Sequence, residues 1–178
     1  MDYYFSTSYF TLVPESLFSP QAKVGYLESL FKIDKGMVAR SVKLEGTPAF
    51  MVYAQPEIFD EWQHEEKNIY PLALYFYNRL MEMKSHNKVI MSIDRRHKIT
   101  HLAAAVGNDL KLINTYNTGD FSSALYYLFL ALKELQLNPA LTHIRLYNTI
   151  DTPKMELLNN YFNTIEVYEP DCNIISLR

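Results

Sequence analysis

The sequence predicts an α/β protein whose second half is a mixed sheet of five strands with helices packed on it. Two observations lead to this fold class. Three strand-like runs joined by short turns lie between residues 88 and 116, and two further runs follow, each reached through a helix. Strands joined by tight turns are antiparallel, whereas strands joined through a helix are normally parallel with a right-handed crossover. A sheet that contains both kinds of connection is mixed.

The first half, residues 1–86, is predicted to form a smaller lobe. Residues 3–13 have the tyrosine, phenylalanine and threonine content of one strand, which stops at a proline. Ser19 and Pro20 indicate the start of a helix that ends by Gly36, because serine is a frequent N-cap and proline suits the first helical position. Strands at 37–45 and 49–54, a hairpin loop at 46–48, and helices at 56–62 and 70–83 are expected to follow.

The second half, residues 87–178, is predicted to form the larger lobe after a seam at 85–87. Its longest element is a helix at 119–136, which begins near Asp120 and stops before Pro139. One apolar stripe runs down this helix at spacings of four and three residues, and its members are Phe121, Leu125, Leu128, Leu132 and Leu135. The other expected elements are strands at 88–94, 99–106, 110–116, 143–148 and 165–169, and a helix at 152–162.

Three aromatic residues of the long helix, Tyr126, Tyr127 and Phe129, lie on or beside the stripe. One interpretation is that they complete the core between helix and sheet, as large aromatic side chains commonly do. The other is that Tyr126 and Phe129, which lie off the main stripe, cover a neighbouring lobe or a partner. The first interpretation is favoured.

Composition and charge exclude several classes of protein. Hydrophobic residues make up 48% of the chain and charged residues 21%, which argues against disorder. The formal net charge of −3 disfavours a nucleic-acid partner. The one cysteine, Cys172, cannot form a disulfide framework or a cysteine-based metal site within one chain. No apolar run approaches the ~20 residues of a membrane span, so we expect a cytoplasmic protein with no membrane partner.

Several segments together resemble a known family. Its two most distinctive marks are Thr-Leu-Val-Pro at 11–14, within residues 10–18, and the helix with two tyrosines within residues 124–139. A helix with Tyr26-Leu27 and residues 52–56 and 114–116 also match. The chain is similar to domain of unknown function 3822 (DUF3822), an uncharacterised Bacteroidetes family whose members resemble pilus-assembly actin homologues. The resemblance implies an actin-like ATPase fold of two lobes, each with the strand order of ribonuclease H-like domains. Family members begin with further strands, so the first lobe is expected to be incomplete.

The chain departs from the family's pattern at two places. Ser123 and Ala124 stand where an acidic-aromatic pair is expected before the two tyrosines, and Tyr147-Asn148 stand where the family tends to have a glycine. These departures leave the expected fold unchanged, but they weaken any transfer of a site from the family to this chain.

The resemblance implies a phosphate-binding turn at residues 93–98. Actin-like ATPases hold phosphates with backbone N–H groups in glycine-containing turns that follow an aspartate, because glycine lets the backbone come close. Asp94 is in the expected place, but the turn has no glycine and carries bulky side chains. Asp94 and Arg95 are therefore cofactor-binding candidates only if a nucleotide binds at all.

Other constellations have weak signals. The basic residues around His97 could attract an anion, although such a cluster in a turn is more often a solvated loop. His97 and His101 would need a third ligand to hold a metal ion, and none is nearby in the sequence. Residues 64–66, a His-Glu-Glu run, are predicted to be an exposed helix end. Cys172 has no basic neighbour that would activate its thiol.

A ribonuclease H-type nuclease is also disfavoured. Such enzymes need several carboxylates that converge on two metal ions. Asp94 satisfies the first position and Asp120 could approach the second, but the strand at 143–148 offers no acid for the third. No catalytic residue, cofactor or metal site is predicted.

Two functions remain open. The preferred one is a catalytically inactive binding or scaffold module that forms a homodimer or meets a protein partner through an open strand edge at residues 3–13. The alternative is a nucleotide-binding ATPase or sensor that uses the cleft between the lobes, with Asp94 and Arg95 at its mouth.

Overall fold

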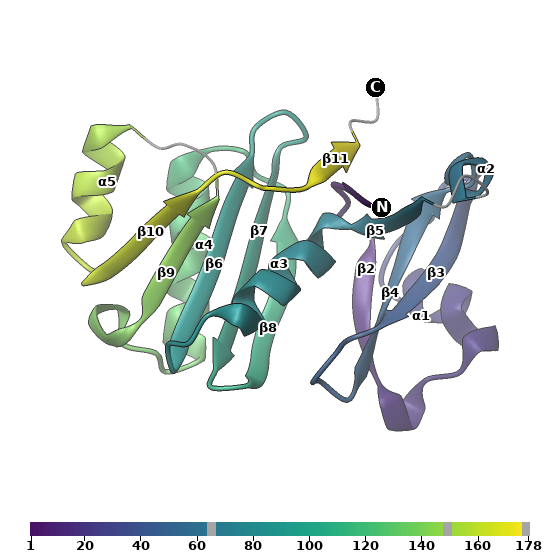
Figure 1. The fold of residues 1–178 in the computed structure, drawn as a ribbon, viewed down its shortest axis with the longest axis horizontal. Coiled ribbons are helices and arrows are strands. Elements are labelled where there is room, and N and C mark those ends of the chain that lie inside the picture. Colours follow the sequence, from purple (N-terminus) through teal and green to yellow (C-terminus); the bar gives the residue numbers. More distant parts are fainter. Residues whose placement is uncertain (64–66, 148–150, 176–178) are drawn as a thin grey trace. The chain divides into compact units, whose positions relative to one another are not determined.

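A mixed sheet of five strands forms most of the second half of the chain, as the sequence predicts (Figure 1). The computed structural model describes residues 1–63, 67–147 and 151–175. The strands are β6 (Asn87–Asp94), β7 (Ile99–Val106), β8 (Asp109–Tyr116), β9 (His143–Tyr147) and β10 (Thr164–Tyr168). Their order is β10-β9-β6-β7-β8, with β6, β7 and β8 antiparallel and β9 parallel to both β6 and β10.

Helices α4 (Phe121–Glu134) and α5 (Thr152–Asn159) cover one face of this sheet (Figure 1). Helix α4 begins where predicted because the Asp120 carboxylate accepts a hydrogen bond from the Ser123 N–H, 2.8 Å away. Three members of the predicted stripe are buried, whereas Leu125 and Leu135 pack against the core from partly buried positions. The buried core comprises Val89, Met91, Ile93, Leu102, Ala104, Phe121, Ala124, Leu128, Leu132, Ile144, Leu146, Leu158 and Phe162.

Helix α3 (Leu72–Glu82) packs on the opposite face of the same sheet. The ring of Phe76 lies 5.2 Å from the ring of His101 in β7 and 5.2 Å from that of Tyr147 in β9. The buried Lys88 in β6 donates from Nζ to the Met83 carbonyl, 2.8 Å away, just after the helix ends. Two helix layers therefore enclose the sheet, as its parallel part requires.

The aromatic residues of α4 have different environments. Tyr127 stacks on Tyr116 of β8 with ring centroids 4.0 Å apart, and Phe129 packs 4.9 Å from Tyr161. Tyr126 is 63% exposed. The interpretation that these rings complete the core holds for Tyr127 and Phe129, whereas Tyr126 projects into solvent.

The first half contains two sheets of three strands each. Strands β11 (Asn173–Ile175), β1 (Asp2–Phe5) and β5 (Asn68–Pro71) are all parallel, in that spatial order. Strands β2 (Phe10–Pro14), β4 (Ala49–Pro56) and β3 (Met37–Lys43) form the antiparallel second sheet, in that order. The predicted hairpin of β3 and β4 is present, and Gly46 supplies the positive φ of +79° that its turn needs. Helix α1 (Lys23–Glu28) packs on the antiparallel sheet, and α2 (Phe59–Gln63) follows β4.

The prediction of one strand over residues 3–13 is wrong. The chain turns between β1 and β2, where the Thr7 hydroxyl accepts the Tyr9 N–H at 3.1 Å, and the two strands enter different sheets. Strand β1 lies in the centre of its sheet, so it is not the open edge that was expected. Strand β2 does lie at an edge of its sheet.

Three other elements differ from expectation. The helix expected to extend to Gly36 is a 3₁₀ turn at Pro20–Ala22 followed by α1, which ends at Glu28. Strand β5 occupies the start of the helix expected at 70–83, because Ile69 and Pro71 pair with β1. Strand β11 has no sequence prediction. Asn148 and residues 64–66 lie outside the described residues.

By contacts within the chain, residues divide into two units. One comprises Met1–Leu74 and the segment from Cys172, and the other comprises Tyr75–Asp171. Most of α3 lies in the predicted lobe 1–86 but belongs to the second unit, together with the five-stranded sheet on which it packs. Strand β11 lies in the predicted lobe 87–178 but belongs to the first unit. The lobe boundary at residue 86 stays a prediction. None of the helices in the described residues combines the length and apolar character needed to span a membrane.

The core position of α4 predicts a contrast between two neighbouring side chains. Leu128 is fully buried, so Leu128→Ala should lower the free energy of unfolding by about 2–5 kcal/mol. Tyr126→Ala, two residues away on the exposed side, should change it by no more than about 0.5 kcal/mol. Urea unfolding followed by circular dichroism measures both. Equal losses would contradict the orientation of the helix.

Candidate functional site

The turn between β6 and β7 is held by its own first residue. The Asp94 carboxylate accepts a hydrogen bond from the His97 N–H at 3.0 Å through Oδ1, and its Oδ2 lies 2.7 Å from His97 Nδ1. Lys98 completes the turn with a left-handed φ of +55°. The aspartate at the expected phosphate position therefore binds its own turn.

The same turn lies against the start of α4 at backbone distance. A Cβ placed on Gly119 would lie 3.0 Å from Lys98 Cα and 3.2 Å from Arg95 Cα. The Thr100 hydroxyl donates to the Thr118 carbonyl at 2.8 Å and joins β7 to the same segment. Turn and helix start are thus packed together with no space for a side chain between them.

Asp120 acts as a helix cap. Besides the Ser123 N–H, its carboxylate accepts a hydrogen bond from the Thr118 hydroxyl at 2.7 Å. The hydrogen bonds from Ser123, and then that from Thr118, lower the pKa of Asp120 to about 2. Within the described residues, no three His, Cys, Asp or Glu side chains gather closely enough to hold a metal ion.

Asp151 is a neighbour of the turn that sequence reasoning missed. Its carboxylate caps α5 by accepting the Lys154 N–H at 3.1 Å. Hydrogen bonds from Lys154 lower the pKa of Asp151, and the positive charges of Lys154 and Arg95 add to the effect. The aspartate before Thr152-Pro153 was a recognisable N-cap signal. Because β6 and β9 are parallel, this end of the sheet brings together residues that follow both strands.

His97 and His101 have separate structural roles and do not form a metal-binding pair within the described residues. His97 bonds to Asp94, as described above. His101 is buried under α3, where its ring packs on Phe76. Burial lowers the pKa of His101 to about 4; the His97 charge acts in the same direction and the Asp94 charge opposes it. His101 is therefore a neutral core residue at neutral pH.

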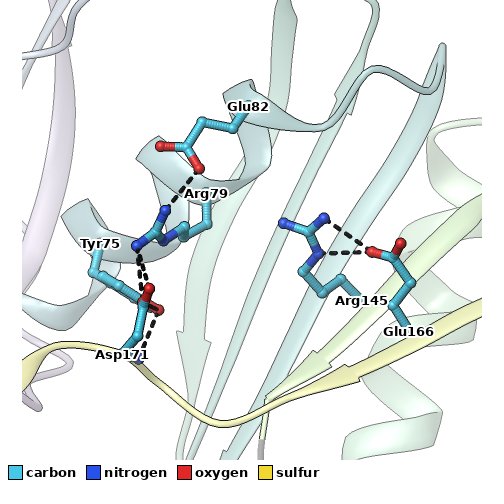
Figure 2. Close-up of polar contacts among 6 residues, drawn as sticks. All are labelled: Tyr75, Arg79, Glu82, Arg145, Glu166 and Asp171. Carbon is cyan, nitrogen blue, oxygen red and sulfur yellow. Dashed lines mark hydrogen bonds and ion pairs between the residues drawn. The ribbon is translucent and has the colours of Figure 1, made fainter.

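A second set of polar contacts lies on the α3 face of the sheet (Figure 2). Arg79 of α3 donates to both carboxylate oxygens of Asp171 at 2.8 Å and to Glu82 at 2.8 Å. The Tyr75 hydroxyl donates to the same Asp171 carboxylate at 2.5 Å. Burial, and then the hydrogen bond to Asp171, raise the pKa of Tyr75. These contacts attach the segment that follows β10 to α3.

Beside them, four residues form a chain of polar contacts that includes a serine, a histidine and a glutamate. Ser85 Oγ lies 2.7 Å from His143 Nδ1, and His143 Nε2 lies 3.2 Å from Glu166 Oε2. Arg145 bonds to that same oxygen through Nε at 3.0 Å and through its terminal nitrogen at 2.9 Å (Figure 2). The Arg145–Glu166 ion pair joins β9 to β10. His143 Nε2 lies near the same carboxylate but is buried without a hydrogen bond within the described residues.

Sequence reasoning could not anticipate this second set. Arg145 and Glu166 meet because β9 and β10 pair in that register, and Asp171 reaches α3 from 96 positions away along the chain. Neither relation leaves a local pattern in the sequence.

Comparisons with known proteins agree with the fold. The family described as "Protein of unknown function (DUF3822)" matches residues 3–166. A crystal structure from Bacteroides thetaiotaomicron, of a protein with an actin-like ATPase fold and unknown function, is similar with a TM-score of 0.77 and 18% identity, over 97% of this chain and 69% of that one. This similarity confirms the predicted actin-like ATPase fold.

A weaker similarity is to a chain of the PilM-PilN type IV pilus biogenesis complex. Its TM-score is 0.47 with 13% identity, over 93% of this chain and 67% of that one. A comparison with curated proteins gives no match.

The close packing at Gly119 predicts that adding one methyl group at this position lowers the stability of the fold. Gly119→Ala should lower the free energy of unfolding by about 1–3 kcal/mol, because backbone atoms of the turn must move. The matched control is Gly25→Ala in α1, where nothing lies within 4 Å of the added Cβ. The control should gain about 0.5–1 kcal/mol from helix propensity. Urea unfolding measures both, and a neutral Gly119→Ala would contradict the packing.

Burial of His101 predicts acid sensitivity. Its folded pKa of about 4 lies below its ordinary value of 6.5, so between these pH values the unfolded chain binds a proton that the folded chain does not. Stability is therefore complete above pH 6.5 and falls as pH falls, by about 2 kcal/mol at pH 5. The glutamine of His101→Gln does not titrate, so the free energy of unfolding of this variant should fall by about 2 kcal/mol less than that of the wild type between pH 7 and pH 5. Unfolding curves at both pH values test this, and equal losses would contradict it.

Proposed function

The chain belongs to the DUF3822 family, and from this membership and the geometry of its β6–β7 turn we propose that it is a catalytically inactive module that binds protein partners. Its actin-like fold supplies the scaffold. The two units serve in this proposal as the two lobes of that fold, the first one incomplete.

The observation that carries the proposal is the bonding of Asp94. A phosphate-binding turn needs backbone N–H groups that point to the ligand, and close approach of the ligand to the backbone. In this turn the His97 N–H donates to Asp94 instead, and residues 95–98 carry four long or bulky side chains. The packing of the turn on Gly119 fixes this arrangement.

Binding of a protein partner is supported by the antiparallel sheet of the first unit. Both β2 and β3 are outer strands of that sheet within the described residues. Outer strands present unpaired backbone groups to which another chain can bind. The homodimer or protein partner was expected to bind at residues 3–13. Because β1 is central in its sheet, β2 is the strand of this segment to which a partner could bind.

A cytoplasmic location belongs to the same proposal. Its support is the single cysteine, Cys172, which is half-buried and has no second cysteine with which to form an intramolecular disulfide.

The alternative is a nucleotide-binding ATPase or sensor that uses Asp94 and Arg95. Thermal unfolding with and without magnesium-ATP separates the two functions. At about 5 mM ligand, a Kd of about 50 μM would add about 2.7 kcal/mol to stability and raise Tm by several degrees. We expect no shift with Mg-ATP or Mg-ADP, and no release of phosphate.

Asp94→Ala and Arg95→Ala are the matched variants for this test. A shift of several degrees in the wild type that disappears in both variants would overturn the proposal in favour of the sensor. A shift that both variants keep would also overturn it, because nucleotide would then bind elsewhere in the protein.

A further inference from the structure

The second unit begins and ends on two residues that bind each other. Tyr75 is its first residue and Asp171 its last, so the chain passes from one unit to the other just before Tyr75 and just after Asp171. The Tyr75 hydroxyl donates to the Asp171 carboxylate at 2.5 Å and accepts the Asp171 N–H at 3.2 Å. The two ends of the unit are therefore joined directly.

Arg79, one turn further along α3, binds the same carboxylate. Its Nη2 lies 2.8 Å from each oxygen of Asp171, and Figure 2 shows this contact beside that of Tyr75. The guanidinium also lies over the Tyr75 ring, 5.2 Å from its centroid. Hydrogen bonds between charged groups are stronger than neutral ones. We call Tyr75, Arg79 and Asp171 the clasp.

Strand β11, which follows the clasp, is weakly held by its own contacts. It has three residues, and within the described part of the chain it pairs with β1 alone, at the outside of the parallel sheet. Asn173 and Ile174 are exposed. Strands this short lie at the lower limit of observed lengths, and parallel pairing is slightly less stable than antiparallel pairing. The attachment of β11 therefore depends on how the chain before it is held.

The clasp holds that chain close to the sheet of β1. Tyr75 follows Pro71 by four positions, and Pro71 pairs with Phe5 of β1. On the other side, Cys172 alone separates Asp171 from the first residue of β11. A short tether raises the effective concentration of a strand at its partner. When the clasp opens, residues 169–172 lose their attachment to α3 and this advantage is lost.

Strand β1 has a second and firmer neighbour. It pairs with β5 over four residues, and Asn68 Nδ2 donates to Asp2 Oδ1 at 3.0 Å. Phe5 is buried, with its ring 5.3 Å from that of Phe59. Strand β1 therefore stays in its sheet without β11, and the side that β11 covered becomes an unpaired edge.

We propose that the clasp controls whether β11 covers the edge of β1. When closed it holds β11 in place, and when open it lets β11 detach and uncovers that edge. The Asp171 side chain is 68% exposed, so water and salt reach the ion pair and the clasp can open while α3 stays folded. The inference goes beyond the proposed function, and a shift in Tm with Mg-ATP would leave it untouched.

The single cysteine of the chain, Cys172, reports on opening because it is the first residue after the clasp. Its half-buried thiol is alkylated with iodoacetamide, a neutral reagent, and the rate is followed by mass spectrometry. Asp171→Ala and Arg79→Ala remove charges of opposite sign, so their direct effects on thiolate formation are opposite. Both variants should nevertheless react about fivefold faster or more than the wild type, because both open the clasp.

Glu82→Gln is the matched control. It breaks the other ion pair of Arg79, also at 2.8 Å, without touching residues 169–172, and it should react as the wild type does. Tyr75→Phe removes the hydroxyl and keeps the ring that packs on Phe76. It should also react faster, and it decides the matter if the charge variants fail to fold.

Amide exchange measured by NMR then tests the strand itself. The N–H groups of Tyr3, Tyr4 and Phe5 alternate between β11 and β5, so those directed to β5 are an internal control. In Tyr75→Phe and Asp171→Ala, the amides of β11 and the β1 amides directed to it should exchange about tenfold faster. The β1 amides directed to β5 should keep their protection.

Three results would overturn the inference. The first is an alkylation rate that stays unchanged in the clasp variants, or that rises in one charge variant and falls in the other, since charge alone would then explain it. The second is faster alkylation with unchanged exchange in β11, because β11 would then be held by β1 alone. The third is loss of protection along the whole of β1, because β1 would then need β11 to stay in its sheet.

Discussion

The close approach of the β6–β7 turn to Gly119 is the contact on which the second unit depends. It sets where α4 starts relative to the ends of β6 and β7, because backbone atoms of residues 95 and 98 leave no room at position 119 for a side chain. With its start held, α4 directs Phe121, Leu128 and Leu132 onto the sheet. The same contact brings Asp94 and Asp120 to one end of the sheet, where each carboxylate binds nearby groups of its own chain. The position of α4 and the close packing of the β6–β7 turn thus have a common physical origin.

The opposite face of the sheet is organised by polar contacts between distant segments. Arg79 and Tyr75 bind Asp171, and Arg145 joins β9 to β10 through Glu166. Buried or half-buried guanidinium groups are costly unless they are paired, and each has a carboxylate partner in this unit. The polar contacts on this face therefore join α3 to the segment after β10, and β9 to β10.

Local patterns were sufficient to predict the sheet and the two later helices of the second unit, but in the first unit they predicted the β3–β4 hairpin and not the division of residues 3–13 between two sheets. The stripe of α4 and the turn at Gly107 are local signals, and the sheet order follows from connection rules. The prediction of one strand over residues 3–13 failed because strand composition does not say which sheet a residue joins. Phe5 and Phe10 are both buried, yet they belong to different sheets. Strand β11 has three residues, too few for a periodic signal. At the β6–β7 turn, the sequence predicted that Asp94 ends the strand, but not that His97 would bind its carboxylate.

The central position of β1 has a consequence for how the chain folds as it is synthesised. Its two neighbours, β5 and β11, come from residues 68–71 and 173–175, so one is made early and the other last. The parallel sheet therefore stays open on one side of β1 until the whole of the second unit has left the ribosome, and contacts this far apart in sequence form slowly. During that interval β1 is an unpaired edge of the nascent chain on the side that β11 later occupies.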